Sequence, residues 1–165
     1  MSLPDIAIAR EDPASADAQA CIAAYLRELS VRFPEGFDAS RGPSAAPADF
    51  APPNGVLLLA RRDGIAIGCG GLKALGAAVG EIKRMWIAPE ARGLGLARRL
   101  LAALEDEARA KGLHIVRLDT HRVLEEARAL YARNGYAEIA AYNDNPYAHH
   151  WFEKRIAPVS ADREP

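Results

Sequence analysis

One segment, residues 81–112, constrains the fold more than any other, because it reads as a strand, a tight turn and a helix in direct succession. The strand is expected to begin near Val79 and to end at Ile87, shortly before a proline that cannot join a ladder. Leucines at helical spacing follow, with Gly112 as the C-terminal stop of the helix. A second strand at 114–118 completes a parallel crossover unit, which the handedness rule makes right-handed.

The segments on either side supply the remaining elements. In chain order we expect a strand (6–8), a helix (about 13–30), a hairpin with an Asp-Gly turn (56–60 and 65–70), a helix (about 125–134) and two closing strands (136–139 and 149–156). The sequence therefore predicts an α/β domain with a mixed, mostly antiparallel sheet. It contains one parallel strand-helix-strand crossover and has helices on both faces.

Length and composition limit the chain to one domain. With 165 residues, half of them apolar, it can bury one core but is short for two. We expect a single domain over residues 1–157 and a disordered tail over 158–165. Residues 33–54 hold many prolines and glycines and almost no apolar period, which is typical of a lid, a binding loop or disorder.

Charge and cysteine usage argue against several classes of protein. The formal net charge is -1 with both signs interspersed, so no basic surface for nucleic acid is expected. No leader and no apolar run of membrane-spanning length occurs, which predicts a cytoplasmic protein. Cys21 and Cys69 lack metal-ligand spacing to any histidine, so we expect free thiols and no metal.

The turn between strand and helix carries the main functional signal. Residues 92–99 read Arg-Gly-Leu-Gly-Leu-Ala-Arg-Arg, and such small residues leave backbone N–H groups open to close approach. A helix N-terminus prefers acids, yet three arginines cluster here and no acid occurs between Ala91 and Leu104. Each misplaced cation costs roughly a few tenths of a kcal/mol unless an anion is bound. The pattern favours a site for the pyrophosphate of a nucleotide-containing cofactor, with a plain tight turn as the alternative.

Two known nucleotide-binding motifs can be compared with this segment. A phosphate loop ending in Gly-Lys-Ser/Thr is absent. A dinucleotide fingerprint fits Gly93 and Gly95, with Asp119 as the ribose acceptor, but its third glycine is replaced by Arg98. The strand 81–87 also alternates charged and apolar residues, unlike a parallel strand buried on both faces. We therefore expect one face of this strand to border a wet cleft.

Residues 92–97 resemble the hallmark of the GCN5-related N-acetyltransferase (GNAT) family: Arg or Gln, two residues, Gly, one residue, then Gly or Ala. The resemblance extends over about residues 56–152 and includes Glu-Ile-Lys-Arg-Met-Trp-Ile-Ala-Pro at 81–89 and Ala-Leu-Tyr-Ala-Arg-Asn-Gly-Tyr at 129–136. It implies a single acyl-CoA N-acyltransferase domain. The implied reaction moves an acetyl group from acetyl-CoA directly to a primary amine of a small molecule or an exposed protein amine.

The resemblance also implies how the cofactor is held. Backbone amides of residues 93–98 would bind the pyrophosphate, and the end of the preceding strand would pair with the pantetheine arm and polarise the acetyl carbonyl. The implied cofactor-binding residues are Met85, Trp86, Ile87, Arg92, Gly93, Leu94, Gly95, Leu96, Ala97 and Arg98. One departure is Leu124, because many members carry an Asn seven residues before the Tyr of the Leu-Tyr pair.

Two residues are candidates for proton transfer. Glu81 is the candidate base, acting through a water, since the strand register could place it on the face that Met85 addresses. Its ordinary pKa of about 4.3 is too low for the task unless burial raises it, and an ion pair with Lys83 or Arg61 is the alternative. Tyr131 resembles the family's general acid. A phenol of pKa about 10 protonates a thiolate of about 8.5 uphill by ~2 kcal/mol, so a hydrogen-bond donor describes it better, with a core tyrosine as the alternative.

The acceptor site is expected in two loops, 32–37 and 142–147, with Arg32, Phe33, Tyr142 and Asn143 as the substrate-binding candidates. Three histidines, at positions 121, 149 and 150, lie nearby by strand order, although a structural role is commoner for such residues. A non-catalytic acyl-CoA-binding sensor is the alternative function, and a dinucleotide-binding protein is the third. We expect no nucleic-acid or membrane partner, and a homodimer is left open.

Overall fold

The computed structural model describes residues 5–42 and 46–157, so the expected tail at 158–165 lies outside the described residues. The elements are β1 (Ile6–Glu11), α1 (Ala16–Arg32), β2 (Gly55–Arg62), β3 (Ile65–Ala74), β4 (Val79–Ile87), α2 (Leu96–Ala110), β5 (Ile115–Thr120), α3 (Glu125–Arg133), β6 (Ala137–Ile139) and β7 (His150–Arg155). Short 3-10 turns are η2 (Ala39–Arg41), η3 (Pro47–Phe50) and η4 (Pro89–Ala91). No helix among these residues is long and apolar enough to cross a membrane.

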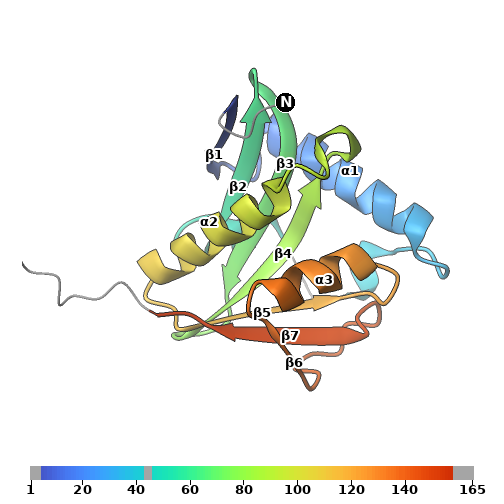
Figure 1. Ribbon diagram of the computed structural model, residues 1–165, viewed down its shortest axis with the longest axis vertical. Helices are drawn as coiled ribbons and strands as arrows, with labels where there is room; N and C mark the ends of the chain where they lie inside the picture. The colour runs from blue at the N-terminus through green and yellow to red at the C-terminus, as the bar shows by residue number, and fades with distance from the viewer. Residues whose placement is uncertain (1–4, 43–45, 158–165) are drawn as a thin grey trace, which may run out of the picture.

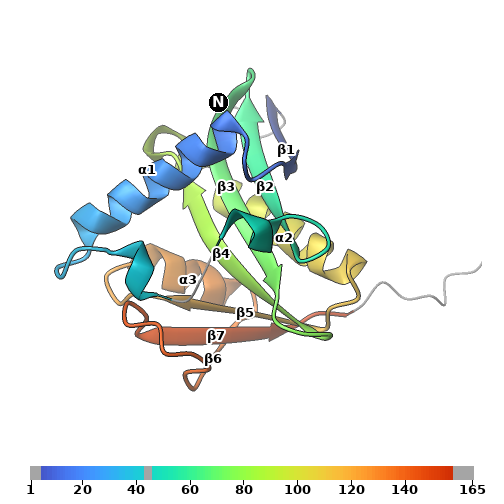
Figure 2. The ribbon, with the colours of Figure 1, turned by 180° about the vertical axis from the view of Figure 1, so that it is seen from behind.

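The strands form one sheet in the order β1-β2-β3-β4-β5-β7-β6. Only β4 and β5 pair in parallel, and α2 connects them, so the predicted crossover and mixed sheet are confirmed. Helices α2 and α3 cover one face, while α1 lies on the other (Figures 1 and 2). The prediction of helices on both faces is therefore confirmed as well.

Some element boundaries differ from those expected. The first helix begins at Ala16 rather than near Pro13, because Ser15 is its N-cap and accepts a hydrogen bond from the Ala18 N–H at 3.1 Å. The first strand extends to Glu11, because all six of its residues pair with β2. The long loop after α1 contains η2 and η3, and Phe50 of η3 is only 2% exposed. Part of that loop is thus packed against the sheet.

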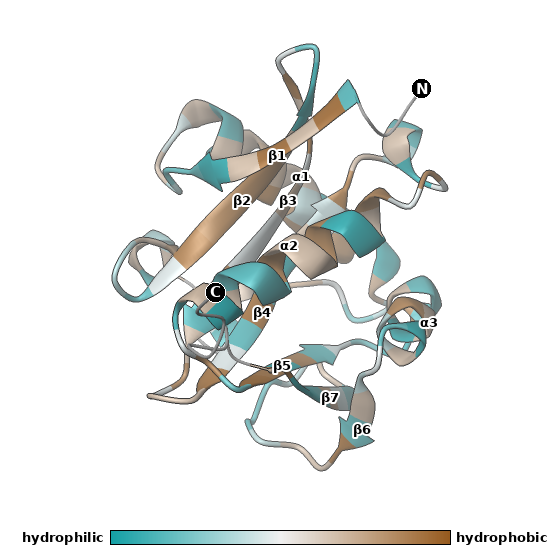
Figure 3. Ribbon diagram, turned by 60° about the vertical axis from the view of Figure 1, so that its left-hand side comes forward, coloured by the Kyte–Doolittle hydropathy of each residue, from teal (hydrophilic) through white to brown (hydrophobic). Residues whose placement is uncertain are grey.

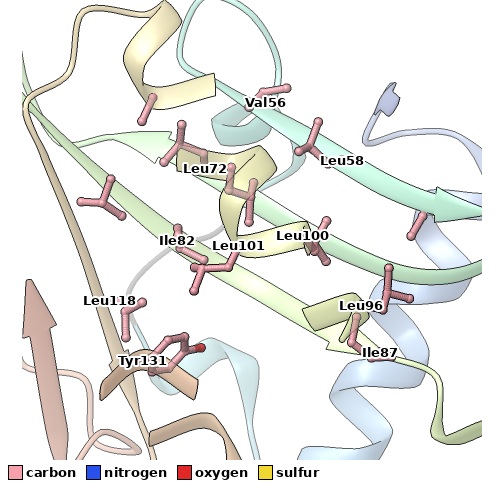
Figure 4. Close-up of a cluster of buried hydrophobic side chains, with 14 of the residues drawn as sticks. Val56, Leu58, Leu72, Ile82, Ile87, Leu96, Leu100, Leu101, Leu118 and Tyr131 are labelled. Carbon is pink, nitrogen blue, oxygen red and sulfur yellow. The ribbon is translucent and has the colours of Figure 1, made fainter. Parts of the chain in front are cut away.

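Two hydrophobic clusters hold the helices to the sheet. On one face, the α2 stripe of Leu96, Leu100, Leu101, Leu104 and Ala108 is buried against the strands, as Figure 4 shows for several of these leucines. On the other face, Ala18 and Cys21 of α1 pack with Leu57 and Leu59 of β2. In Figure 3, β2 is coloured mostly as hydrophobic, whereas α2 carries both hydrophobic and hydrophilic residues around its circumference. Burial of these apolar stripes fixes both helices over the sheet.

The sheet opens between its two parallel strands. Only residues 79–81 of β4 pair with β5, and beyond Glu81 the two strands diverge (Figure 1). β4 continues along β3 to Ile87, whereas β5 continues along β7 to Thr120. The β5-side edge of residues 82–87 is therefore left without a strand partner. This opening is where the candidate site lies.

The raised pKa values of four tyrosines predict how the stability of the protein changes in alkali. Burial is the main cause that raises the pKa of Tyr25 to about 12, and it raises the pKa of Tyr131, Tyr136 and Tyr142 further above the ordinary value of about 10. The unfolded chain therefore loses these protons first, so stability is intact below about pH 10 and declines as pH rises through the folded-state values. Each phenol contributes a slope of ~1.4 kcal/mol per pH unit.

Urea unfolding between pH 8 and pH 11 measures this decline. Tyr25→Phe is the matched variant, because the Tyr25 hydroxyl has no hydrogen-bond partner among residues 5–42 and 46–157. It should flatten the decline above pH 10 and leave stability at pH 8 nearly unchanged. A free energy of unfolding that stays constant from pH 9 to pH 11 would contradict the prediction.

Candidate active site

The turn before α2 presents free backbone donors. Gly93 and Gly95 have φ values of 80° and 76°, in the left-handed region that favours glycine. Gly95 is the N-cap of α2 and offers no side-chain acceptor, and the helix ladder starts at the Arg99 N–H, which donates to the Gly95 carbonyl at 3.2 Å. Within the described parts of the chain, the N–H groups of residues 93–98 make no hydrogen bond. A Cβ built on Gly93 would meet nothing within 4 Å, so the turn is open to a ligand.

The arginines of this turn have different roles. Arg92 donates through Nε to the Ile87 carbonyl at 3.0 Å and forms an ion pair with Glu28, so it ties β4 to α1. Arg98 is exposed, and its guanidinium has no ion pair with a described residue. The first turn of α2 contains no acid. The positive end of the helix dipole and Arg98 therefore both favour a negative charge at this point.

A larger cavity of about 760 Å³ lies between α1, the end of β4, this turn and α3. Nine of the ten residues expected to bind the cofactor line it: Met85, Trp86, Ile87, Arg92, Gly93, Gly95, Leu96, Ala97 and Arg98. Leu94 is the exception and does not border the cavity. The cavity thus joins the free donors of the turn to the unpaired edge of β4.

A smaller cavity of about 140 Å³ lies deeper in the opening between β4 and β5. Its wall comes from α1, β4, β5, α3 and the two loops that the sequence predicts for the acceptor. Six residues line both cavities: Tyr25, Leu29, Met85, Leu124, Ala127 and Tyr131. The two cavities therefore meet, and these residues form their boundary.

Tyr131 lies at that boundary, and its hydroxyl makes no hydrogen bond with a described residue. The side chain extends from α3 beside Leu118 (Figure 4), and the residue is 8% exposed. Its hydroxyl has no hydrogen-bond partner among the described residues, and it is not sealed within the core. Burial, followed by the charges of Tyr25 and Asp119, raises its pKa above the ordinary phenol value. The phenol therefore stays protonated at neutral pH and can donate one hydrogen bond into the cavities.

Glu81 is buried, with 3% exposure, and borders neither cavity. Its carboxylate accepts a hydrogen bond from the Tyr142 hydroxyl at 2.6 Å and pairs with Lys83 at 3.3 Å. Lys83 lines the smaller cavity, so this ion pair connects Glu81 to a residue of the cavity wall. Glu81 and Met85 were expected to point to the same face of β4, because side chains alternate between the two faces of a strand. A bulge at Arg84, whose φ is 59°, interrupts this alternation between them.

The substrate-binding candidates fall into three places. Phe33 lines the smaller cavity, whereas Arg32 lines the larger one and pairs with Glu126 and Glu28. Tyr142 and Asn143 border neither cavity. Asn143 instead donates to Asp119 at 2.8 Å and accepts from the Trp151 indole at 2.9 Å. Asn143 is therefore linked to the smaller cavity through its hydrogen bond with Asp119, which lines that cavity.

The three histidines are held by neighbours. His121 is 1% exposed and stacks on Phe33 with ring centroids 4.0 Å apart. Its Nδ1 accepts from the Val123 N–H at 3.1 Å, so its Nε2 is the protonated nitrogen that donates to Glu35 at 2.7 Å. His149 accepts from the Arg122 N–H, and His150 lies 3.2 Å from Glu138. No group of three or more His, Cys, Asp or Glu residues that could hold a metal occurs within residues 5–42 and 46–157.

Among the residues of the smaller cavity that the sequence does not reveal are Tyr25, Arg84 and Asp119. Tyr25 has the helical spacing of the apolar residues of α1, and only the structure shows that it lines both cavities. Asp119 was considered solely as a ribose acceptor. Arg84 gave no local signal, because a bulge depends on how two strands register with each other.

Comparison with known proteins agrees with this geometry. The model of the Acetyltransferase (GNAT) family matches residues 22–136. The chain is 35% identical over 146 residues to an IAA acetyltransferase of Azospirillum brasilense, covering 88% of this chain and 92% of that protein. A crystal structure from Klebsiella pneumoniae, described as a candidate acyl-CoA N-acyltransferase, is 34% identical, with a TM-score of 0.74 and coverage of 91% and 97%. A GNAT acetyltransferase from Elizabethkingia anophelis, solved with acetyl-CoA bound, shares the fold at 17% identity, with a TM-score of 0.62 and coverage of 92% and 99%. The chain therefore belongs to the GNAT acetyltransferase family.

Proposed function

We propose that the protein moves the acetyl group of acetyl-CoA directly to the primary amine of a small molecule or an exposed protein amine. The observation that supports this most is the meeting of two cavities at Tyr131. One cavity offers free donors for a diphosphate, and the other offers polar groups for an acceptor. Such an arrangement lets both reactants bind at once, as a direct transfer requires.

The larger cavity fits acetyl-CoA by its donor set. The free N–H groups of residues 93–98 and the Arg98 guanidinium would hold the pyrophosphate, and the unpaired edge of β4 at residues 85–87 would hold the amides of the pantetheine arm. Leu124 lies on the cavity wall and supplies an apolar contact where many family members have an Asn. When bound, acetyl-CoA supplies the activated thioester. The structure from Elizabethkingia anophelis, which contains acetyl-CoA, supports the same use of the fold.

Tyr131 is proposed to hold a proton near the leaving sulfur. Its raised pKa makes it a weak acid, so the role that fits is hydrogen-bond donation rather than full proton transfer. Glu81 is proposed as the group that takes up the amine proton. Because Glu81 does not border the smaller cavity but pairs with Lys83, which does, the proton would have to pass through a water or along that ion pair.

The pH dependence of Glu81→Gln tests this second role. If Glu81 accepts the proton, kcat/KM should fall ~100-fold near pH 7 and recover as the amine loses its own proton at higher pH. Tyr142→Phe, which removes the hydrogen bond to Glu81, is the control for positioning. A loss in Glu81→Gln that is equal at every pH would instead assign Glu81 to holding Lys83 and Tyr142.

Release of free CoA, followed with a thiol reagent across a panel of amines, tests the function itself. We expect acetyl-CoA-dependent release with at least one amine. Acetyl-CoA binding without release on any amine would indicate a non-catalytic sensor. Thermal stabilisation by NAD but not by acetyl-CoA would indicate a dinucleotide-binding protein, since a ligand at 100 times its dissociation constant adds ~2.7 kcal/mol.

A further inference from the structure

The smaller cavity is lined by an arginine whose guanidinium has no ion pair with a described residue. Arg84 lines this cavity, and its side chain makes no hydrogen bond or ion pair with any residue of 5–42 or 46–157. The neighbouring cation, Lys83, is different because Glu81 pairs with it at 3.3 Å. A partly buried cation is costly without a counter-charge. Arg84 is therefore suited to an anionic group of a ligand.

The backbone at Arg84 is held in an unfavourable conformation. Its φ of 59° lies in the left-handed region, which residues with a Cβ seldom adopt. Trp86 pairs with Cys69 and Lys83 pairs with Gly71, so Arg84 sits within the intervening bulge. The Cys69 thiol donates to the Arg84 carbonyl at 3.1 Å and helps to fix it. Bulges of this kind can re-aim a side chain beside active sites, and Arg84 lines the smaller cavity at this bulge.

A carboxylate borders the same cavity from the other strand. Asp119 of β5 accepts hydrogen bonds from Asn143 at 2.8 Å and from Asn145 at 3.2 Å, which hold it in place. Its charge contributes to the raised pKa of both Tyr25 and Tyr131, two residues that line both cavities. One wall thus offers a cation and another an anion near the point of transfer.

The volume of the cavity limits the size of the acceptor. At the ~30 Å³ that each water occupies in the liquid, a space of about 140 Å³ holds about five waters. This suits a small molecule rather than a large one. A large polycation would fit neither this volume nor the unpaired Arg84.

We infer that the acceptor is a small amino acid or related amino acid-like compound, whose carboxylate binds Arg84 and whose amine lies toward Asp119 and Tyr131. This inference rests on the proposed acetyl transfer and adds the class of acceptor. A planar guanidinium binds a carboxylate through two parallel hydrogen bonds, which gives orientation as well as affinity. An amine without an acid group would leave Arg84 unpaired and place a second cation near it.

The test compares acids with their amides. Free CoA release and equilibrium binding to the CoA-loaded protein are measured for the twenty standard L-amino acids, β-alanine and 4-aminobutyrate, each beside its carboxamide. At least one acid should be acetylated with kcat/KM about 100-fold above its amide. Arg84→Gln should remove that preference, mainly through KM, and Arg84→Lys should restore part of it. The glutamine keeps the bulge conformation as strained as before, so folding is expected to be preserved.

Arg27→Gln is the matched control, because it removes the same charge from an exposed residue that borders neither cavity. It should leave the preference for acids unchanged, and all variants should bind acetyl-CoA as the original protein does. Equal use or equal binding of acids and amides, or a preference that survives in Arg84→Gln, would overturn the inference. If no amine releases CoA but acids still bind better than amides through Arg84, the proposed reaction fails while the carboxylate site stands.

Discussion

Replacing Gly95 by valine is expected to raise the Kd for acetyl-CoA at least 100-fold. Gly95 has a φ of 76° at the N-cap of α2, where a branched side chain is strained and would also stand among the free N–H groups of residues 93–98. A 100-fold weaker affinity equals ~2.7 kcal/mol, which is the loss of two or three hydrogen bonds to a charged group. Isothermal titration calorimetry with acetyl-CoA measures the change directly.

Gly64→Val is the control variant, because it introduces the same backbone strain at a turn that is not expected to bind acetyl-CoA. Gly64 has a nearly equal φ of 77°, in the hairpin turn between β2 and β3, and a Cβ there would meet nothing within 4 Å. Both variants should lose comparable stability in thermal unfolding, but Gly64→Val should bind acetyl-CoA normally. A Gly95→Val protein that binds acetyl-CoA within about threefold of the original would show that the pyrophosphate does not lie on this turn.

Removing the Tyr131 hydroxyl is expected to lower kcat ~100-fold and to leave the Kd for acetyl-CoA nearly unchanged. Tyr131 lines both cavities, and its hydroxyl has no hydrogen-bond partner within residues 5–42 and 46–157, so Tyr131→Phe removes no hydrogen bond that these residues make. Loss of one well-placed donor costs about 100-fold to 1000-fold in kcat when charge develops beside it. Stability should be nearly unchanged, because the hydroxyl has no hydrogen-bond partner among the described residues and is not sealed within the core.

Tyr136→Phe is the control variant, which should lose stability and keep its kcat. Its ring lies 5.8 Å from that of Tyr131, but its hydroxyl donates to buried Glu105 at 2.8 Å, inside the core. Loss of that bond to a buried carboxylate should cost about 1–3 kcal/mol of stability and spare kcat. A Tyr131→Phe enzyme with full kcat, or one destabilised as much as Tyr136→Phe, would show that Tyr131 is a core tyrosine.

Much of the fold was predictable because its signals are local. The crossover of β4, α2 and β5 followed from a leucine stripe at helical spacing, a glycine stop and two flanking apolar strands. β4 was predicted with the observed bounds, Val79–Ile87, and the Asp-Gly turn adopts the left-handed φ values that such a hairpin requires. The start of α1 was misplaced by three residues because Pro13 and Ser15 both suit a helix start, and the Ser15 side chain is the one that caps it.

The sequence by itself determined the elements, their order and the open, basic turn before α2, because helix stripes, turn glycines and caps act within a few residues of the chain. The tertiary structure alone decided that Tyr25 and Tyr131, from α1 and α3, line both cavities. It also decided that Glu81 borders neither cavity and pairs with Lys83, and that Arg84 borders the smaller cavity. Those facts depend on where β4 parts from β5 and where its register with β3 shifts. Both are results of pairing between distant segments, which no local pattern of residues encodes.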